Sequence, residues 1–479
     1  MKDAAVLIPL AFLRRVSGCL GAMAAVMVIG WAAPDAAAGA GTTGEAHRRP
    51  NVLVILADDL GYGDLSSFGA EDIDTPHLDR LVASGMKLTQ FYANSPVCSP
   101  TRASLLTGCY PDAVGVPGVI RTHARNSWGY LDPQVPLLPA VLKAAGYRTA
   151  MVGKWHLGLA EPNLPNSRGF DSFHGFLGDM MDDYFNHRRH GINYMRRNRQ
   201  QIDPPGHATD LFTRWACQWL EGQDGRQPFF LYLAYNAPHS PIQPPQEYLA
   251  RYHARHPDVP PKRARFAALV EHLDAGVGQV LQALERSGRA GNTLVLFSSD
   301  NGGAEYFGSD NGPLAGGKQE MLEGGIRVPA AAVWPGRIRP GSSCDRVALT
   351  MDLFATICQA ANASIDHPID GRSILDTLLG KPQPPEDRYL FWVRLEGGRR
   401  YGGQPYYAAR HGDWKLLQNS PSEPFRLYHL AEDPTERSDL ASRHPDVAAR
   451  LKKALDAHIA RCADIPWRGP DGKGPGEID

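Results

Sequence analysis

Short runs of apolar residues that end abruptly in polar ones recur along the chain. The runs cover residues 51–57, 147–152, 229–235 and 293–299. Such runs, rich in β-branched and aromatic residues, are typical of strands buried in a parallel sheet. Between the last two runs, apolar residues recur at helical spacing, at Phe266, Leu269, Val270, Leu273, Val277, Val280, Leu281 and Leu284. Strands that alternate with helices predict an α/β fold whose parallel sheet is covered on both faces.

Polar side chains of chemically useful kinds follow each predicted strand. They are Asp58, Asp59, Lys154, His156, His239, Asp300 and Asn301. In open α/β sheets, ligands bind in the crevice beyond the carboxyl ends of the strands. A polar loop after one strand is ordinary, but four strands that deliver carboxylates, a lysine and histidines to one edge predict a common site.

The segment after Cys98 reads as the start of a helix. Ser99 is a candidate N-cap, Pro100 suits the first turn, and Gly108 is a candidate helix end. Cys98 would then lie where backbone N–H groups and the helix dipole favour negative charge. Arg102, four residues further on, would share its face of the helix.

The N-terminal residues have the features of an export signal. Arg14 and Arg15 precede an uncharged stretch, Val16–Pro34, and small residues follow it. We therefore expect a signal peptide over residues 1–38 and a protein that is exported, periplasmic or secreted, with no stable membrane span after cleavage. The alternatives are a retained membrane anchor, a lipid anchor on Cys19 and a twin-arginine signal.

Composition narrows the class of protein. The 479 residues include 50 Lys+Arg and 51 Asp+Glu, a formal net charge of −1, which argues against nucleic-acid binding through bulk positive charge. Hydrophobic residues make up 43%, enough for a globular core.

The seven cysteines include no C-x-x-C pair, which makes a cysteine zinc site a poor hypothesis. One disulfide is compatible with their spacing, and the sequence does not name its partners.

A Pro-rich stretch at residues 381–385 is typical of a linker. It predicts a catalytic domain over residues 50–380 and a C-terminal subdomain over residues 386–479. Within the latter, residues 388–393 and 414–417 are predicted strands, and residues 446–461 a predicted helix.

The carboxylates at the predicted strand ends suggest a metal site. Asp58, Asp59, Asp300 and Asn301 offer hard oxygen ligands, which suit Ca²⁺, or Mg²⁺ as the second choice, and not zinc. A solvated pair of aspartates is the alternative for Asp58 and Asp59 taken alone.

The pattern C-x-P-x-R at Cys98–Arg102, followed by ASLLTG, resembles the signature of the type I, formylglycine-dependent sulfatases. This family includes arylsulfatases and N-acetylgalactosamine-6-sulfatases and belongs to the alkaline phosphatase superfamily. Further resembling segments span nearly the whole mature chain, at residues 51–64, 153–158, 236–241, 299–303, 316–329, 410–415 and 427–430. The resemblance implies a large mixed, mostly parallel sheet sandwiched by helices, with a smaller C-terminal α+β subdomain.

The resemblance also implies a reaction, that of a sulfuric ester hydrolase. In this family the cysteine is oxidised to Cα-formylglycine (3-oxoalanine) by a formylglycine-generating enzyme, so Cys98 is the implied modified residue. Its hydrated aldehyde, a gem-diol, would attack sulfur and form a covalent sulfoenzyme intermediate. Loss of a proton from the second hydroxyl would then expel sulfate. The implied cofactor is one Ca²⁺, which residue 98 would also contact.

Roles for the remaining residues follow from the same resemblance. Arg102, Lys154 and Lys318 would surround the diol and the sulfate as fixed cations. His156 would hydrogen-bond the diol and help to deprotonate it, and His239 would face the leaving oxygen. Either His239 or Lys318 could be the general acid, and the sequence does not divide that role between them.

The expected substrate is a sulfated carbohydrate or an aryl sulfate. The cationic segment at residues 187–199 is either a loop that meets an anionic glycan or a solvated loop. A phosphonate or phosphate monoester hydrolase on the same scaffold is the second enzyme hypothesis, although we find no ligand cluster for a second metal. A lectin-like protein without catalysis is the third, and it predicts damage at the motif residues, all of which are intact.

Overall fold

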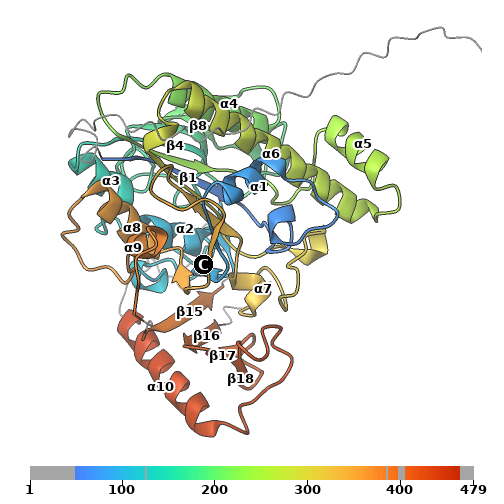
Figure 1. The fold of residues 1–479 in the computed structure, drawn as a ribbon, viewed down its shortest axis with the longest axis vertical. Coiled ribbons are helices and arrows are strands. Elements are labelled where there is room, and N and C mark those ends of the chain that lie inside the picture. The colour runs from blue at the N-terminus through green and yellow to red at the C-terminus, as the bar shows by residue number, and fades with distance from the viewer. Residues whose placement is uncertain (1–48, 124–126, 385–386, 397–404, 464–479) are drawn as a thin grey trace, which may run out of the picture. The chain divides into compact units, whose positions relative to one another are not determined.

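The computed structural model describes residues 49–123, 127–384, 387–396 and 405–463, and its centre is a ten-stranded sheet (Figure 1). The strand order is β13-β2-β12-β11-β1-β10-β4-β5-β8-β9. These strands are β1 (Asn51–Ala57), β2 (Met86–Leu88), β4 (Arg148–Lys154), β5 (Ser172–Phe176), β8 (Met195–Arg197), β9 (Gln200–Gln201), β10 (Phe229–Ala234), β11 (Thr293–Ser299), β12 (Ala330–Val333) and β13 (Ser342–Cys344). The predicted signal peptide lies outside the described residues.

The four predicted strands are confirmed as β1, β4, β10 and β11, and they are neighbours in the sheet. They are parallel: Leu53 of β1 is in register with Leu231 of β10 on one side and with Val295 of β11 on the other. The boundaries of two strands differ: β4 begins at Arg148 and extends to Lys154, and β10 ends at Ala234, one residue early. Antiparallel pairs at β11–β12 and β5–β8 make the sheet mixed, as predicted.

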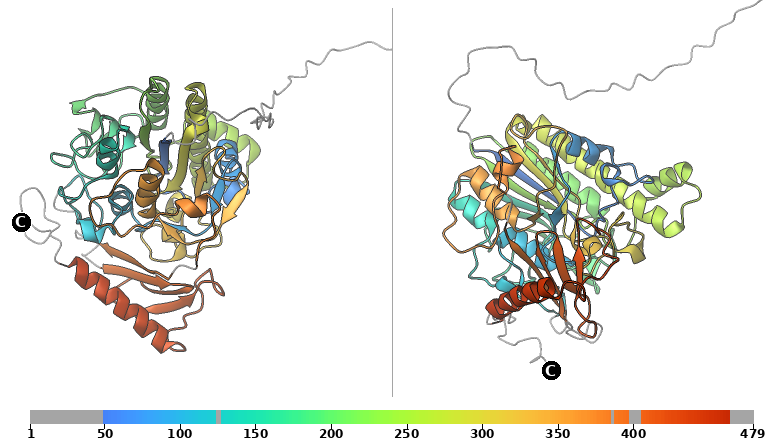
Figure 2. Two further views of the ribbon diagram at one scale, coloured as in Figure 1. Left: turned by 60° about the vertical axis from the view of Figure 1, so that its left-hand side comes forward. Right: turned by 60° about the horizontal axis from the view of Figure 1, so that its bottom comes forward.

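Alternate side chains of β1 pack into two separate hydrophobic clusters, one on each face of the sheet. Leu53 and Ile55 pack in one cluster with residues of α1 (Pro76–Ala83), α4 (Ala208–Glu221) and α6 (Pro261–Arg286). Val52 and Val54 pack in the other, with residues of α2 (Cys98–Thr107), α3 (Leu138–Ala144) and α8 (Asp352–Ala361). Figures 1 and 2 show helices on both faces, which confirms the predicted sandwich.

Helix α2 begins at Cys98, as predicted, but Ser99 is not its cap. Val97 occupies the N-cap position without a side-chain hydrogen bond. The hydroxyl of Ser99 instead accepts a hydrogen bond from the backbone N–H of Ile120 (3.1 Å), because Ser99 is already inside the first turn. Gly108 does end the helix, with φ of 71°, and a Cβ atom there would lie 2.9 Å from the Phe354 ring.

A second, four-stranded antiparallel sheet forms the C-terminal part of the chain. Its strands are β15 (Tyr389–Leu395), β16 (Pro405–His411), β17 (Trp414–Gln418) and β18 (Arg426–His429). The predicted strands are therefore found, and the predicted helix is α10 (Pro445–Cys462). One face of this sheet packs on α10, and its other face contributes Trp392 and Leu417 to a cluster with Tyr92 and Ile326. The predicted domain boundaries stay predictions.

The remaining helices and strands are β3 (Phe91–Tyr92), β6 (Arg188–Arg189), β7 (Ile192–Asn193), β14 (Ala348–Leu349), α5 (Gln246–Arg255), α7 (Glu323–Ile326) and α9 (Leu375–Leu378).

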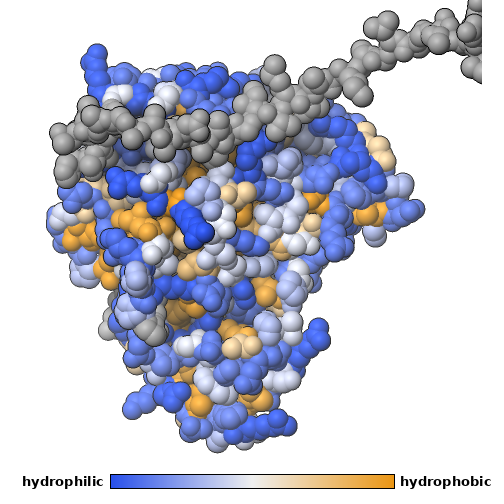
Figure 3. Space-filling model, viewed as in Figure 1, coloured by the Kyte–Doolittle hydropathy of each residue, from blue (hydrophilic) through white to orange (hydrophobic). Residues whose placement is uncertain are grey.

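The six cysteines that the structure describes are all free, so no disulfide is present among them. Among the described helices, none is both long and apolar enough for a membrane span. The face in Figure 3 is largely hydrophilic, with scattered hydrophobic residues.

Candidate active site

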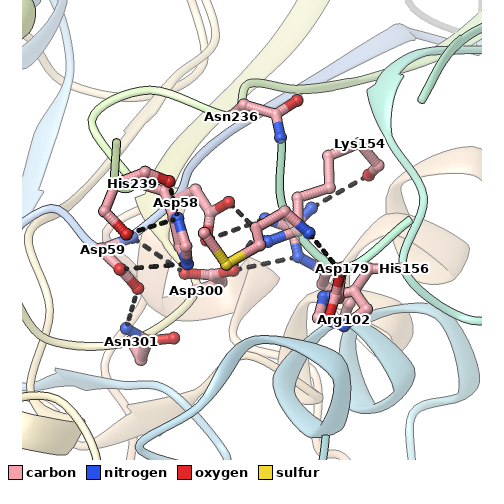
Figure 4. A network of polar contacts seen from close by, with 12 residues as sticks. Asp58, Asp59, Arg102, Lys154, His156, Asp179, Asn236, His239, Asp300 and Asn301 are labelled. Carbon is pink, nitrogen blue, oxygen red and sulfur yellow. Dashed lines mark hydrogen bonds and ion pairs between the residues drawn. The ribbon is translucent and has the colours of Figure 1, made fainter. Parts of the chain in front are cut away.

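The carboxyl ends of β11, β1, β10 and β4 bring the predicted polar residues together in one buried network (Figure 4). Asp58, Lys154 and Asp300 have no exposed surface, although charged residues are almost never fully buried unless they are paired. Helix α2 adds Cys98 and Arg102 from outside the sheet. The predicted common site is therefore a real cluster in the structure.

Arg102 and Lys154 neutralise two of the buried carboxylates. Arg102 donates from Nε (3.0 Å) and Nη2 (2.7 Å) to Asp300 Oδ2, and from Nη1 to the Lys154 carbonyl (3.0 Å). Its Nη2 also lies 3.6 Å from Asp58 Oδ1. Lys154 Nζ donates to Asp58 Oδ2 (2.6 Å). A charged side chain is stable in a dry interior only when an opposite charge lies as close to it as these do.

A second group of contacts surrounds Asp59. Lys318 Nζ donates to Asp59 Oδ2 (2.6 Å), and Asn301 Nδ2 donates to Asp59 Oδ1 (2.8 Å). His239 Nε2 lies 3.5 Å from Asp59 Oδ2. Burial raises the pKa of Asp59, but the nearby His239 and Lys318 outweigh burial and hold the pKa below its ordinary value. Asp59 has φ of 64°, a backbone conformation that non-glycine residues seldom adopt and that clusters at functional sites.

The donor set fits a hard divalent cation. Asp58 Oδ1 and Asn301 Oδ1 are buried oxygens without a hydrogen-bond partner, and such oxygens are costly unless something binds them. Ligand atoms of Asp58, Asp59, Cys98 and His239 all lie within 4.8 Å of one another.

The geometry differs from the predicted ligand set at two residues. Asp300 Oδ2 already accepts two N–H groups of Arg102, and its Oδ1 accepts the Asp59 N–H (3.3 Å). His239, predicted only as an acid–base residue, lies within the ligand-type group. The predicted oxygen set of Asp58, Asp59, Asp300 and Asn301 stays a prediction.

Cys98 lies at the first residue of α2, with 4% of its surface exposed. Burial raises the pKa of its thiol to about 12 despite the nearby lysines. The thiol therefore stays protonated at neutral pH, and a protonated thiol is a weak nucleophile.

His156 has one unused nitrogen. Its Nε2 hydrogen-bonds the Ile120 carbonyl (2.7 Å), which must be the acceptor, so Nε2 carries a proton. Nδ1 is buried without a partner. Burial, together with Lys154 and Arg102, holds the pKa of His156 well below its usual value. His156 lines the same pocket as Cys98, and its neutral ring leaves Nδ1 unprotonated.

His239 and Lys318 differ in charge. His239 Nδ1 donates to the Ser240 carbonyl (2.6 Å), and burial lowers the pKa of His239 to about 3. Burial also works against the charged form of Lys318, but Asp59 and other anions outweigh it and raise the pKa of Lys318 above its ordinary value. Lys318 is therefore a cation that holds protons, whereas His239 is neutral; the division of the acid role stays a prediction.

A pocket of about 230 Å³ opens beside these residues. The predicted residues Cys98, His156, His239 and Lys318 line it. Sequence reasoning missed other lining residues: Arg121, Asp179, Tyr306, Gln319 and Glu396. Of these, only Asp179 could have been found from the sequence, because it follows β5, a further parallel strand of the sheet. The five residues of β5 were not recognised from the sequence as a strand.

Two adjacent arginines of the cationic segment 187–199 are paired with carboxylates. Arg188 pairs with Asp203 (2.6 Å), and Arg189 pairs with Asp179 (2.9 Å) and with an adjacent carboxylate, Asp182 (2.8 Å). These contacts favour a structural role for the segment over a free cationic surface. Just upstream, Tyr184 donates to the carbonyls of two residues in the His239 loop, at 2.7 and 2.8 Å.

A mixed sheet that presents buried carboxylates, fixed cations and a helix-start cysteine at one edge defines a hydrolase of anionic esters. The comparisons with known proteins name the family. A sulfatase family model matches residues 50–363, and a model of the C-terminal part of N-sulphoglucosamine sulphohydrolase matches residues 317–461. The chain belongs to the sulfatase family, and it is a sulfuric ester hydrolase.

Relatives and solved structures agree. N-acetylgalactosamine-6-sulfatase of the dog, Canis lupus familiaris, is 37% identical over an alignment that covers 88% of each chain. Arylsulfatase J of the mouse, Mus musculus, is 32% identical, over 87% of this chain and 76% of the mouse protein. The crystal structure of Ps i-CgsB in complex with k-i-k-neocarrahexaose has a TM-score of 0.80 at 30% identity, over 88% of this chain and 95% of that chain. These matches do not favour the phosphonate or phosphate hydrolase alternative.

Proposed function

We propose that this sulfatase hydrolyses sulfate esters of carbohydrates, with residue 98 as the nucleophile and one Ca²⁺ at the neighbouring carboxylates. The observation that carries the proposal is the placement of Cys98 at a helix start in the pocket, with the buried groups of Arg102 and Lys154 beside it. The carbohydrate substrate is supported by relatives that are named as N-acetylgalactosamine-6-sulfatases and by the structure in complex with an oligosaccharide.

The metal would be held by Asp58, Asp59, Asp300 and Asn301, with the side chain of residue 98 as a further ligand. The unpartnered oxygens of Asp58 and Asn301 support this assignment, and all-oxygen donor sets suit calcium better than zinc. When bound, the cation would polarise the nucleophile and reduce the negative charge of the sulfate group.

Cys98 would be converted to Cα-formylglycine by a formylglycine-generating enzyme during export. The raised pKa of the buried thiol supports this requirement, because an unmodified thiol would stay protonated. When oxidised, residue 98 supplies a hydrated aldehyde, whose hydroxyl group is the nucleophile and needs a base beside it.

His156 would be that base. Its Nδ1 has no protein partner, and the Ile120 carbonyl fixes the tautomer by accepting the Nε2 proton. Arg102, Lys154 and Lys318, which bond Asp300, Asp58 and Asp59 in the structure, would also bind the sulfate oxygens. Fixed cations that need no reorganisation are usually the largest catalytic contribution in such sites.

Release of free sulfate tests the proposal. We expect the enzyme, produced with a formylglycine-generating enzyme and supplied with Ca²⁺, to release sulfate from 4-nitrocatechol sulfate and from at least one 6-sulfated hexosamine or galactose. Cys98→Ala is the matched control and should release none. Hydrolysis of phenyl phosphonate esters in preference to every sulfate ester would refute the assignment and favour the alternative hydrolase.

A further inference from the structure

The segment that carries Lys318 is anchored by the C-terminal sheet. Arg394 of β15 donates from Nη1 to the carbonyl of Gln319, the residue next to Lys318 (2.7 Å). Two residues further on, the N–H of Met321 donates to Asn419 Oδ1 (2.6 Å), just after β17. The Lys318 side chain donates to Asp59, so the position of its backbone decides whether Nζ reaches the site. That backbone is also held by the N–H of Lys318, which donates to the Gly303 carbonyl (3.0 Å), and by the N–H of Gln319, which donates to the Pro96 carbonyl (2.9 Å).

Glu323, at the start of α7, adds a buried ionic anchor to the same segment. Lys415 Nζ lies 2.9 Å from Glu323 Oε1 and 2.8 Å from Glu436 Oε1, and Glu436 Oε2 accepts the N–H of Glu323 (2.6 Å). Figure 1 shows α7 close to the strands of the C-terminal sheet. The segment from Gln319 to Glu323 is thus bonded to the C-terminal sheet at both of its ends.

The same strand also holds the opposite wall of the pocket. Glu396, which follows β15, pairs with Arg121 (Oε2 to Nη2, 3.0 Å) and accepts the N–H of Val119 (3.4 Å). Arg394 Nε in turn donates to Glu396 Oε1 (3.4 Å). One guanidinium group, on Arg394, therefore connects the lysine segment to the carboxylate that orients Arg121.

Burial shows that these contacts are not surface pairs. Arg394 is 2% exposed and Glu396 is not exposed at all, whereas the side chain of Arg121 is 21% exposed and lines the pocket with Cys98. Buried ion pairs hold their partners tightly, because loss of one charge leaves the other uncompensated. Arg121 can therefore meet a substrate. Arg394 does not line the pocket, and Glu396 lines it with both of its carboxylate oxygens already bonded, to Arg121, Val119 and Arg394.

We propose that Arg394 and Glu396 are positioning residues, which help to set the place of two cations that line the substrate pocket, Lys318 and Arg121. The inference rests on the proposed function, in which Lys318 meets the sulfate group. It assigns to the C-terminal sheet a supporting part in catalysis and substrate binding, through Arg394 of β15 and Glu396 directly after it.

The proposal separates two kinetic effects. Arg394→Met removes the hydrogen bond to Gln319, and we expect kcat on 4-nitrocatechol sulfate to fall at least tenfold with KM changed by less than threefold. Arg394→Lys keeps a donor and should recover at least a third of the lost rate. Glu396→Gln loses the charge that orients Arg121, and we expect KM to rise at least fivefold with a smaller change in kcat.

Arg388→Met is the matched control. Arg388 lies just before β15, is 9% exposed against 2% for Arg394, and pairs with Asp352 (2.9 Å), so it is also a largely buried, ion-paired arginine, and it does not line the pocket beside Cys98. We expect it to lower the Tm by an amount similar to Arg394→Met, with kcat and KM within twofold of the parent enzyme.

Hydrogen–deuterium exchange provides a readout that needs no turnover. Arg394→Met should speed exchange in a peptide that covers residues 316–323, and Arg388→Met should not. If the parent enzyme released no sulfate from any ester, the proposed function would fail, and the exchange result would still decide the present proposal. Equal kinetics or equal exchange for the Arg394 and Arg388 variants would overturn it.

Discussion

Removal of the Arg102 guanidinium probes the charge balance of the site. Arg102 is fully buried and lies between two carboxylates, with two hydrogen bonds to Asp300 and a longer approach to Asp58. Methionine has a similar length and no charge, so Arg102→Met keeps most of the packing while it leaves Asp300 without its cation. The Lys154 carbonyl also loses a donor.

The expected loss of stability is large. Removal of one partner from a buried ion pair costs about 3–5 kcal/mol. Roughly 430 residues follow the predicted leader and its short linker, and their unfolding entropy near 60 °C is about 0.9 kcal/mol/K, so this loss corresponds to a Tm about 3–6 °C lower. Bound Ca²⁺ would compensate part of the uncovered negative charge, and the decrease should be smaller with calcium than with a chelator.

Differential scanning fluorimetry with EDTA and with Ca²⁺ measures both effects. The control is Arg286→Met, because Arg286 forms an exposed pair with Glu221, and exposed pairs contribute only about 0–1 kcal/mol. A Tm for Arg102→Met within 1 °C of the control in EDTA would refute the idea that Arg102 balances the carboxylates. If the Tm of Arg102→Met fell by the same amount with EDTA and with Ca²⁺, Arg102 would not share in the charge balance of the metal site.

Three further predictions concern the nucleophile, the metal and pH. Mass spectrometry of the peptide that contains residue 98 should show the aldehyde or its hydrate, and an active preparation with only the thiol would contradict the mechanism. EDTA should abolish sulfate release, and Ca²⁺ should restore it more fully than Mg²⁺; activity that survives chelation would exclude the metal. Burial lowers the pKa of His207 from 6.5 to about 4, so its contribution to stability is complete above pH 6.5 and is lost as the pH falls toward 4. His207→Asn, which keeps an N-cap acceptor for Thr209, should flatten the decrease in Tm over that range, and an unchanged slope would contradict this origin.

The sheet edge could be predicted from the sequence because its determinants are local. The runs before Asp58 and Asp300 are mostly apolar in sequence and buried at every position in the structure, and strands of that kind have few alternatives to the centre of a parallel sheet. Once the strands are parallel, their carboxyl ends must meet. The prediction needed no knowledge of which strand lies beside which.

The rest of the pocket could not be predicted because its residues come from irregular segments. Arg121 lies in a loop, and Glu396 follows an edge strand of another sheet, 275 positions away. Neither residue follows a buried run, and their pairing depends on tertiary packing. The same limit explains the error at Ser99, whose hydroxyl bonds Ile120 rather than its own helix.

The proposed catalytic residues therefore divide into two groups that depend on different parts of the chain. Asp58, Lys154 and Asp300 lie at strand ends of the ten-stranded sheet, where Arg102 of α2 bonds Asp300 and the Lys154 carbonyl. Lys318 lies on a segment that the C-terminal sheet bonds at Gln319 and beyond, and the family model for the C-terminal part begins at residue 317. The domain boundary predicted near residue 380 stays a prediction. Residues from both sides of that position contribute to the site. A substitution in β15 that leaves the metal ligands intact can then still change turnover, because the cation that meets the sulfate is positioned from the other sheet.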